Sequence, residues 1–348
     1  MITANNGFIE QSDRYAFNNA GESLKKYILL RKGELAYNHG ASKLRPYGSC
    51  FSLTTTENAR IPFVYHCFSV GENDPEFMSI ELNGAEIESQ LRRIVSSGAR
   101  MDGLLNISFD EYTSVSVFLP SIAEQKKIST FFNHLDHLIT LHQRKCEKLK
   151  NIKKSMLEKM FPREGASVPE IRFAEFTDAW EQRKLEGLAE FNPKSDLPEQ
   201  FEYVDLESVV GTEMIAHRTE QRASAPSRAQ RLAQTGDLFY QTVRPYQKNN
   251  HLFEKPDNDY VFSTGYAQMR PYCDGHFLLC LVQTDIFLKY VLDRCTGTSY
   301  PAINANDLAE MSVHVPISQA EQEAIGKFFA KLDHLITLHQ RKCEKLKN

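Results

Sequence analysis

Two stretches of the chain carry side chains whose chemistry suits the reading of nucleic-acid bases. Residues 239–250, FYQTVRPYQKNN, interleave aromatic rings with amides and cations, and residues 37–47, YNHGASKLRPY, have a similar composition. Arginine can donate two hydrogen bonds to guanine, glutamine and asparagine can pair with adenine, and lysine can hold a phosphate. A polar hairpin loop that is only solvated has the same composition, so this pattern alone does not decide between the two. The candidate contact residues are Tyr37, Asn38, Ser42, Lys43, Tyr240, Gln241, Arg244, Lys248 and Asn249.

Motifs for catalysis are missing from the sequence. Neither the phosphate loop G-x-x-x-x-G-K-[ST] nor the dinucleotide fingerprint G-x-G-x-x-G occurs. The strings DPEF at 74–77 and NPK at 192–194 lack the second proline of an amino-methyltransferase loop, and the histidines show no metal-ligand spacing. Glu124 is part of a nuclease-like Glu-x-Lys, but a helix cap explains it better. The sequence therefore favours a protein with no catalytic residues, metal or cofactor, and an enzyme is the least favoured alternative.

An internal repeat predicts the elements that would position these loops. The seventeen residues LDHLITLHQRKCEKLKN occur at 135–151 and return unchanged at 332–348. The match continues upstream at the same offset of 197 positions and includes the phenylalanine pairs at 131–132 and 328–329. Such a repeat makes the chain a two-copy protein. Each copy predicts a helix that begins with a Ser-x-x-Glu capping box, formed by Ser121 with Glu124 and by Ser318 with Glu321.

The first of these helices is predicted to be a long rod. Residues 122–161 contain neither proline nor glycine, and their apolar residues recur at helical spacing. A helix of this length measures roughly 60 Å. We expect its apolar stripe to pack against the second copy as an antiparallel coiled coil, with His142 and Lys145 as polar positions that set the register. The alternative is that each helix packs only on its own globular domain.

A globular domain precedes each helix, and the two domains are alike. Residues 33–38, GELAYN, align with 236–241, GDLFYQ, each with a turn glycine and an acid followed by a strand. The expected fold class is α+β, with two mixed α/β domains joined by long helices that form an antiparallel coiled coil. The predicted segments are a first domain at 1–121, a helix at 122–161, a linker at 162–178, a second domain at 179–317 and a second helix at 318–348.

The first domain is expected to lack the opening of the second. Trp180 lies 56 residues before Gly236, whereas only 32 residues precede Gly33. The second helix is likewise shorter than the first. We therefore expect both ends of the two-copy pattern to be incomplete.

Composition restricts the class of function. The net charge of −4 excludes a uniformly basic nucleic-acid binder, so such a function would depend on local patches. Residues 124–163 hold ten lysines or arginines against four acidic residues, although a solvated helix face has the same pattern. Seven cysteines without a close pair fit a reducing compartment, and no apolar run approaches the ~20 residues of a membrane span. The expected location is the cytoplasm, away from any membrane.

The combination of features resembles the specificity subunits of type I restriction-modification enzymes. The resemblance is carried by Pro120 with Glu124 and Gln125, Pro316 with Glu321 and Gln322, the runs GDL at 236–238, VRP at 243–245 and TGT at 296–298, and Arg172 and Phe173 with Trp180. In that family each globular domain is a target recognition domain that reads one half of a split DNA sequence, and the helices are spacers that pair antiparallel. The partners implied are double-stranded DNA, two methyltransferase subunits docked on the helices, and the restriction endonuclease and translocase subunits.

Three functions remain open. The leading hypothesis is a sequence-specific DNA-binding subunit, inactive alone, that directs adenine methylation and DNA cleavage by partner subunits. A non-catalytic adaptor whose two domains bind proteins across a coiled-coil spacer is the first alternative, and the salt dependence of DNA binding would separate it from the leading one. An inactive, truncated specificity subunit is the second, because the first domain has no counterpart of Trp180.

Overall fold

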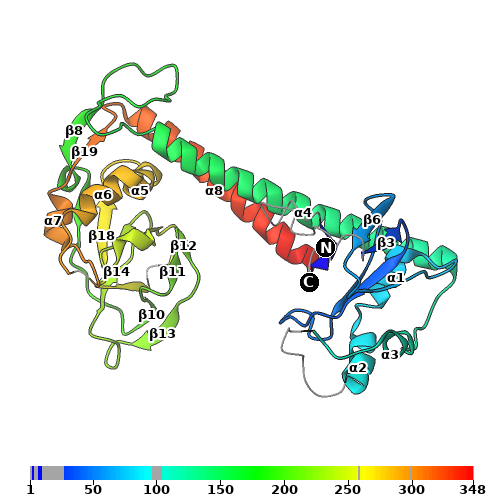
Figure 1. Ribbon diagram of the computed structural model, residues 1–348. Helices are drawn as coiled ribbons and strands as arrows, with labels where there is room; N and C mark the ends of the chain where they lie inside the picture. Colours follow the sequence, from blue (N-terminus) through cyan, green and yellow to red (C-terminus); the bar gives the residue numbers. More distant parts are fainter. Residues whose placement is uncertain are drawn as a thin grey trace. The chain divides into compact units, whose positions relative to one another are not determined.

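The computed structural model describes residues 2–3, 7–9, 27–95, 104–257, 259–297 and 299–347. It divides into two compact units, Met1–Leu138 and Ile139–Asn348. The helix α4, Ile122–Lys159, begins in the first unit and ends in the second (Figure 1). Mixed strands and helices in both units confirm the expected α+β class.

The first unit is built from small antiparallel sheets. β4 (Leu35–Asn38) is the central strand of one sheet, between β5 (Ser49–Ser52) and β7 (His66–Phe68). The other strand pairs are β3 (Ile28–Arg31) with β6 (Asn58–Ile61), and β1 (Ile2–Thr3) with β2 (Gly7–Phe8). The short helices are α1 (Pro75–Glu81), α2 (Ala85–Ile94) and α3 (Phe109–Thr113).

The core of the first unit lies on both faces of β4. Successive side chains of a strand point to opposite faces. Leu35 and Tyr37 accordingly pack in a cluster with residues of α1 and α2, whereas Ala36 packs with Leu30 in a second cluster. A central strand covered on both faces is buried along its length, which leaves the loop after it as the part that reaches the surface.

The second unit contains two four-stranded sheets with the orders β13-β10-β17-β14 and β16-β15-β18-β9. Their strands are β9 (Ala189–Phe191), β10 (Gln200–Val204), β13 (Arg218–Gln221), β14 (Ala229–Leu232), β15 (Leu238–Gln241), β16 (His251–Leu252), β17 (Tyr260–Ser263) and β18 (Tyr266–Pro271). Two further pairs are β11 (Val209–Val210) with β12 (Glu213–Met214), and β8 (Glu181–Lys184) with β19 (Ser312–Val315). The helices are α5 (Gly275–Gln283), α6 (Asp285–Leu292), α7 (Ala305–Ala309) and α8 (Gln319–Lys347), with 3₁₀ turns η2 (Leu185–Gly187) and η3 (Pro245–Gln247).

The bent pair α5 and α6 belongs to the core of the second unit. Phe277, Leu278, Phe287 and Val291 of these helices are buried in its main hydrophobic cluster. Across the described ranges no single helix is long and apolar enough to cross a membrane, and this bent pair meets that test by length and composition alone.

The two units repeat one framework around β4 and β15. Each strand follows a turn glycine with positive φ, 86° at Gly33 and 95° at Gly236, a conformation that glycine adopts without strain. Beyond the strands, the backbone N–H of Leu105 donates to His39 O at 2.8 Å, and that of Ile303 donates to Thr242 O at 3.1 Å. These matching bonds confirm the alignment of the two domains that the sequence predicts.

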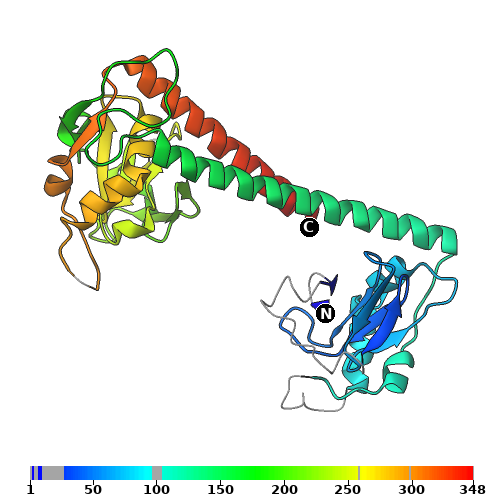
Figure 2. The same ribbon diagram turned by 45° about the horizontal axis from the view of Figure 1, so that its top comes forward.

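In the second unit, α8 runs antiparallel to the second half of α4 (Figure 2). His142 Nδ1 lies 2.8 Å from His339 Nδ1, and Lys153 Nζ lies 2.6 Å from Asp333 Oδ1, so the contacted positions in α8 descend as those in α4 ascend. Ile152 of α4 packs against the hydrophobic cluster of the unit. The predicted antiparallel pair is confirmed. α8 also packs on α5 of its own domain.

The two polar positions predicted to set the register of the helix pair differ. His142 and His339 occupy the same position of the repeat, so their ring contact places a pseudo-twofold axis between them. Burial, and then the neighbouring His142 and Lys145, lower the pKa of His339 below its usual value. The prediction for Lys145 is wrong, because its side chain is exposed and Cys146 takes the buried position. Burying an unpaired ammonium in this seam would cost its hydration.

One of the two predicted capping boxes forms. Glu124 Oε2 accepts from Ser121 N at 3.1 Å, and Glu124 N donates to Ser121 Oγ at 3.4 Å, which confirms the first box. The prediction for Glu321 is wrong. Its carboxylate is buried and accepts hydrogen bonds from Arg172 and Trp180, so it is not available to the backbone of Ser318.

Candidate nucleic-acid interface

Residues at the end of β15 stabilise the conformation of the loop that follows this strand, here called the second-unit loop. Tyr240 and Gln241, at the end of β15, are only 1% and 2% exposed. Gln241 Nε2 donates to Val243 O at 2.6 Å and to Gln247 Oε1 at 2.8 Å, and Gln241 N donates to Asn250 Oδ1 at 2.9 Å. These burials correct the expectation that Tyr240 and Gln241 contact bases. β15 is covered on both faces, so its last side chains reach the core and brace the loop.

Arg244 is the candidate residue best placed to contact DNA. Its backbone is in the left-handed region at φ 54°, which is uncommon for a residue with a Cβ, and its N–H donates to Pro301 O at 2.8 Å. The guanidinium Cζ lies 4.3 Å from the centre of the Tyr300 ring. Stacking uses the face of the guanidinium and not its edge, where the N–H donors lie. The side chain is therefore held in place in a way that suits bidentate recognition of a base or a phosphate.

Lys248 and Asn249 are tied to neighbouring parts of the second unit. Lys248 Nζ donates to Gln283 O at 2.7 Å and to Asp285 Oδ1 at 2.5 Å, and this bond to Lys248 lowers the pKa of Asp285. Asn249 Oδ1 accepts from Gly211 N at 2.8 Å. Lys248 is thereby paired with a carboxylate, and phosphate binding by its ammonium would have to compete with that pair.

The first-unit loop follows the same plan. Tyr37 is buried, stacks on Tyr112 with ring centroids 3.8 Å apart and donates its hydroxyl to Tyr47 O at 2.6 Å, and burial raises its pKa well above the usual value. Asn38 Oδ1 accepts from Gly40 N at 3.0 Å, and Arg45 N donates to Ser42 Oγ at 3.0 Å. Tyr37 is therefore also corrected from a contact residue to a scaffold residue.

The exposed tip of the first-unit loop carries the remaining candidates. Ser42 and Lys43 are exposed in a turn closed by the hydrogen bond from Ser42 N to Arg45 O at 3.0 Å. Leu44, next to them, is 63% exposed. This tip is an exposed polar surface of the first unit and a candidate for contact with DNA.

Two exposed tyrosines were not among the predicted contact residues. Tyr246 in η3 is 49% exposed and Tyr300 is 63% exposed. The Tyr300 ring lies beside the Arg244 guanidinium. Exposed aromatic rings suit stacking on bases and packing along the sugar backbone. Tyr246 lies inside the aromatic and polar run and could have been named from the sequence. Tyr300 could not, because 56 residues separate it from Arg244.

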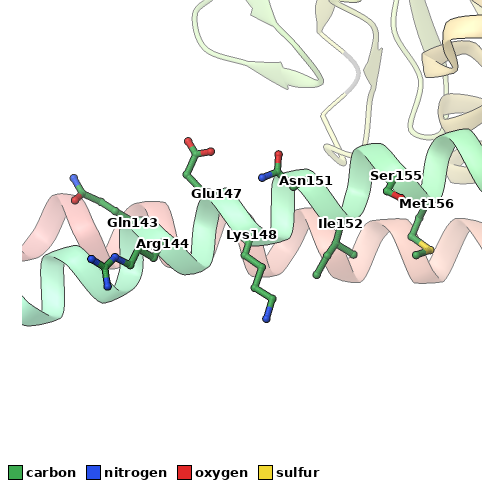
Figure 3. A pocket seen from close by; sticks show the side chains of 8 residues that line it. All are labelled: Gln143, Arg144, Glu147, Lys148, Asn151, Ile152, Ser155 and Met156. Carbon is green, nitrogen blue, oxygen red and sulfur yellow. The ribbon is translucent and has the colours of Figure 1, made fainter. Parts of the chain in front are cut away.

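Identical residues of the helical repeat line two hollows in the second unit. One, of about 620 Å³, is a shallow groove along α4 (Figure 3), and its lining residues are Gln143, Arg144, Glu147, Lys148, Asn151, Ile152, Ser155 and Met156. The other, of about 850 Å³, includes Gln340, Arg341 and Glu344 of α8, which are the repeat counterparts of Gln143, Arg144 and Glu147. Within the described part of the chain, no group of three or more histidine, cysteine or acidic side chains could hold a metal ion.

Comparison with known families gives a match over the second half of the chain. Residues 178–348 match the family described as the type I restriction modification DNA specificity domain. A curated relative, the type I restriction enzyme MjaVIII specificity subunit of Methanocaldococcus jannaschii, is 20% identical over 289 residues, which are 78% of this chain. The chain spans 65% of the length of that relative.

Solved structures share the fold. The S subunit of a type I restriction-modification system from M. genitalium has a TM-score of 0.50 at 16% identity, covering 93% of this chain and 82% of its own. A structure described as showing complex assembly and conformational transition of the type I R-M system has a TM-score of 0.50 at 17% identity, covering 92% and 80%. These likenesses extend over both units of the chain.

Proposed function

We propose, from the match of residues 178–348 to the type I restriction modification DNA specificity domain family, that the chain is the DNA-recognising specificity subunit of a type I restriction-modification complex. Each unit would read one half of a split double-stranded target. The observation that supports this most is the shared framework, in which the same strand ends in a braced polar loop in both units. Two equivalent DNA-recognition loops suit a bipartite target.

In this proposal the loops after β4 and β15 contact the DNA. Arg244, with Tyr246 and Tyr300 beside it, would contact bases or backbone in one half-site, and Ser42 and Lys43 would do so in the other. Lys248 and Asn249 would orient the loop, with a weaker direct contribution. The chain supplies no catalytic step, needs no cofactor and acts in the cytoplasm, where partner subunits methylate adenine and cleave DNA.

The helical repeat supports docking of two identical methyltransferase subunits. The same side chains, such as Arg144 and Arg341, recur on α4 and α8, and the pseudo-twofold axis between His142 and His339 relates the two sets. Two copies of one partner can bind equivalent faces of this kind. The restriction endonuclease and translocase subunits would join that core.

Mapping of methylated adenines tests the proposed function. The chain would be co-expressed with a methyltransferase subunit of its own system, and the host DNA sequenced for modified adenines. We expect one split motif with a fixed gap, because one continuous helix, α4, begins in the first unit and ends in the second. A stable complex that leaves the DNA unmethylated, or methylates a single undivided motif, would contradict a specificity subunit in which each unit recognises one half-site. Cells that lack the chain serve as the control.

Arg244→Ala tests the assignment of the loop. Once the motif is known, we expect the variant to lose roughly 5- to 150-fold of its preference for the correct base in the half-site read by the second unit, since a bidentate arginine contributes ~1–3 kcal/mol of discrimination. Equilibrium binding to the target and to single-base variants measures this. Arg228→Ala removes an exposed arginine of the same unit and should leave the preference unchanged. Equal weakening on every DNA would make Arg244 a phosphate contact.

A further inference from the structure

The beginning of α8 is covered by the segment that follows α4. Arg172 donates from Nε and Nη2 to the two carboxylate oxygens of Glu321 at 2.6 and 2.7 Å, and Trp180 Nε1 donates to Glu321 Oε1 at 3.2 Å. Glu321 is 1% exposed as a result. Residues 162–180 form the loop beside the first turns of α8 (Figure 1), and Figure 2 shows the same arrangement.

Apolar contacts complete this cover. The Phe173 ring packs edge-on against Phe328, with centroids 6.3 Å apart. Phe161, just beyond the end of α4, contacts Phe329 at 6.5 Å, and Phe329 is fully buried. The Phe328–Phe329 pair of the second copy is thus enclosed by the end of one helix and by the segment after it.

The same residues of the first copy lie open in the first unit. Phe131 and Phe132, the counterparts of Phe328 and Phe329, are 59% and 43% exposed. Glu124, the counterpart of Glu321, is exposed, and its hydrogen bonds from Ser121 N and Oγ both end on Oε2. A guanidinium could therefore approach Oε1 without breaking the helix cap.

The local framework of the two copies is nevertheless the same. Gln125 Nε2 donates to Pro120 O at 3.0 Å, and Gln322 Nε2 donates to Pro316 O at 2.9 Å. The copies therefore share this bond at the helix start, and they differ in the partners of the glutamate and in what covers the helix. Adjacent exposed phenylalanines beside a carboxylate are typical of an interaction surface.

We propose that the first-copy surface, formed by Glu124, Phe131, Phe132 and Asp136, binds a segment of a partner protein. This segment has the chemistry of residues 152–180, namely an apolar helix end, then an arginine followed by a phenylalanine, and a tryptophan eight residues after the arginine. Its arginine pairs with Glu124 and its aromatic rings cover Phe131 and Phe132. A lysine in its helix pairs with Asp136, as Lys153 pairs with the repeat counterpart Asp333 at 2.6 Å.

A peptide with the sequence of residues 152–183 tests the proposal. The peptide would carry fluorescein at its N-terminus, and its anisotropy would be followed as the full chain is added. We expect saturable one-to-one binding that weakens at least about tenfold with Glu124→Gln and with Phe132→Ser. Glutamine suits a capping box, so Glu124→Gln keeps the helix start. Glu86→Gln on α2 removes one exposed carboxylate elsewhere in the unit and should leave binding unchanged.

Variants of the peptide provide the reciprocal test. In the peptide, Arg172→Ala should weaken binding to the unmodified chain about as much as Glu124→Gln in the chain does. When the chain already carries Glu124→Gln, Arg172→Ala in the peptide should weaken binding little further. The absence of saturable binding would overturn the proposal. Binding that survives both Glu124→Gln and Phe132→Ser would also overturn it, since the peptide would then be bound at another site, such as the one that its own segment occupies at Glu321.

Discussion

Replacement of Glu321 by alanine is expected to lower the free energy of unfolding of the second unit by about 3–5 kcal/mol, the range for a buried ion pair that loses one partner. The variant leaves the Arg172 guanidinium and the Trp180 indole N–H without their acceptor in a buried site. Trp180 is the only tryptophan, so urea unfolding followed by its fluorescence reports on this unit. We expect a lower midpoint with an unchanged slope.

Glu124→Ala is the matched control, because the same repeat position is exposed in the first copy. It removes a helix cap, which contributes roughly 1 kcal/mol to the first unit, and should not move the Trp180 transition. The double variant Arg172→Met with Glu321→Met should recover part of the stability lost in Glu321→Ala, since it leaves no unpaired charge. Equal effects of the two single alanine variants would contradict the assignment of Glu321 to a buried network.

The two glutamates show where sequence reasoning reaches its limit. Both lie in an identical Ser-x-x-Glu pattern, and a local pattern predicts a local hydrogen bond. Glu124 makes that bond, whereas Glu321 bonds with Arg172, 149 residues earlier in the chain. A charge-assisted bond to a buried guanidinium is stronger than a cap, so the tertiary contact determines the outcome. Nothing in the four residues themselves carries this information.

The repeat and the helices could be predicted because their signals are local or depend on identity. The absence of proline and glycine from 122–161 predicts a continuous helix, and α4 extends over Ile122–Lys159. The seventeen identical residues predict that the two helices present the same side chains at equivalent positions, and His142 contacts its counterpart His339. Heptad spacing does not distinguish Lys145 from its neighbour Cys146, which is the residue buried in the seam.

The candidate loops could be found from composition, but the roles of their residues could not. Tyr240 and Gln241 have the side chains of a contact surface, and both are buried because hydrophobic clusters cover both faces of β15. Gln241 braces the loop through three hydrogen bonds within residues 241–250. The position of the Arg244 guanidinium depends on the Tyr300 ring, which lies in a distant part of the sequence. Which polar side chains face outward is decided by these tertiary contacts.

Asp237→Ala is expected to destabilise the second unit by about 3 kcal/mol, at the lower end of the range for a broken buried ion pair. Asp237 is 1% exposed and accepts from Arg270 Nε and Nη2 at 2.9 and 3.0 Å, from Gln268 Nε2 at 2.7 Å and from Gln234 N at 2.8 Å. The Arg270 side chain is 30% exposed and can regain water when its partner is lost, which moderates the cost. The Trp180 fluorescence transition in urea measures the change.

Glu34 gives the matched variant for this position. It follows the equivalent turn glycine, and its Oε2 accepts from Arg31 N at 2.7 Å, as Asp237 Oδ2 accepts from Gln234 N. Because that turn bond is exposed, Glu34→Ala should cost the first unit only about 1 kcal/mol. Hydrogen exchange of β4 and β5 would measure it in a unit without tryptophan. If Asp237→Ala cost no more than Glu34→Ala, the bonds to Arg270 and Gln268 would add nothing to the turn, and the core of the second unit would not depend on this carboxylate. We expect the opposite, because the buried amide of Gln268 and the guanidinium of Arg270 have Asp237 as their shared acceptor.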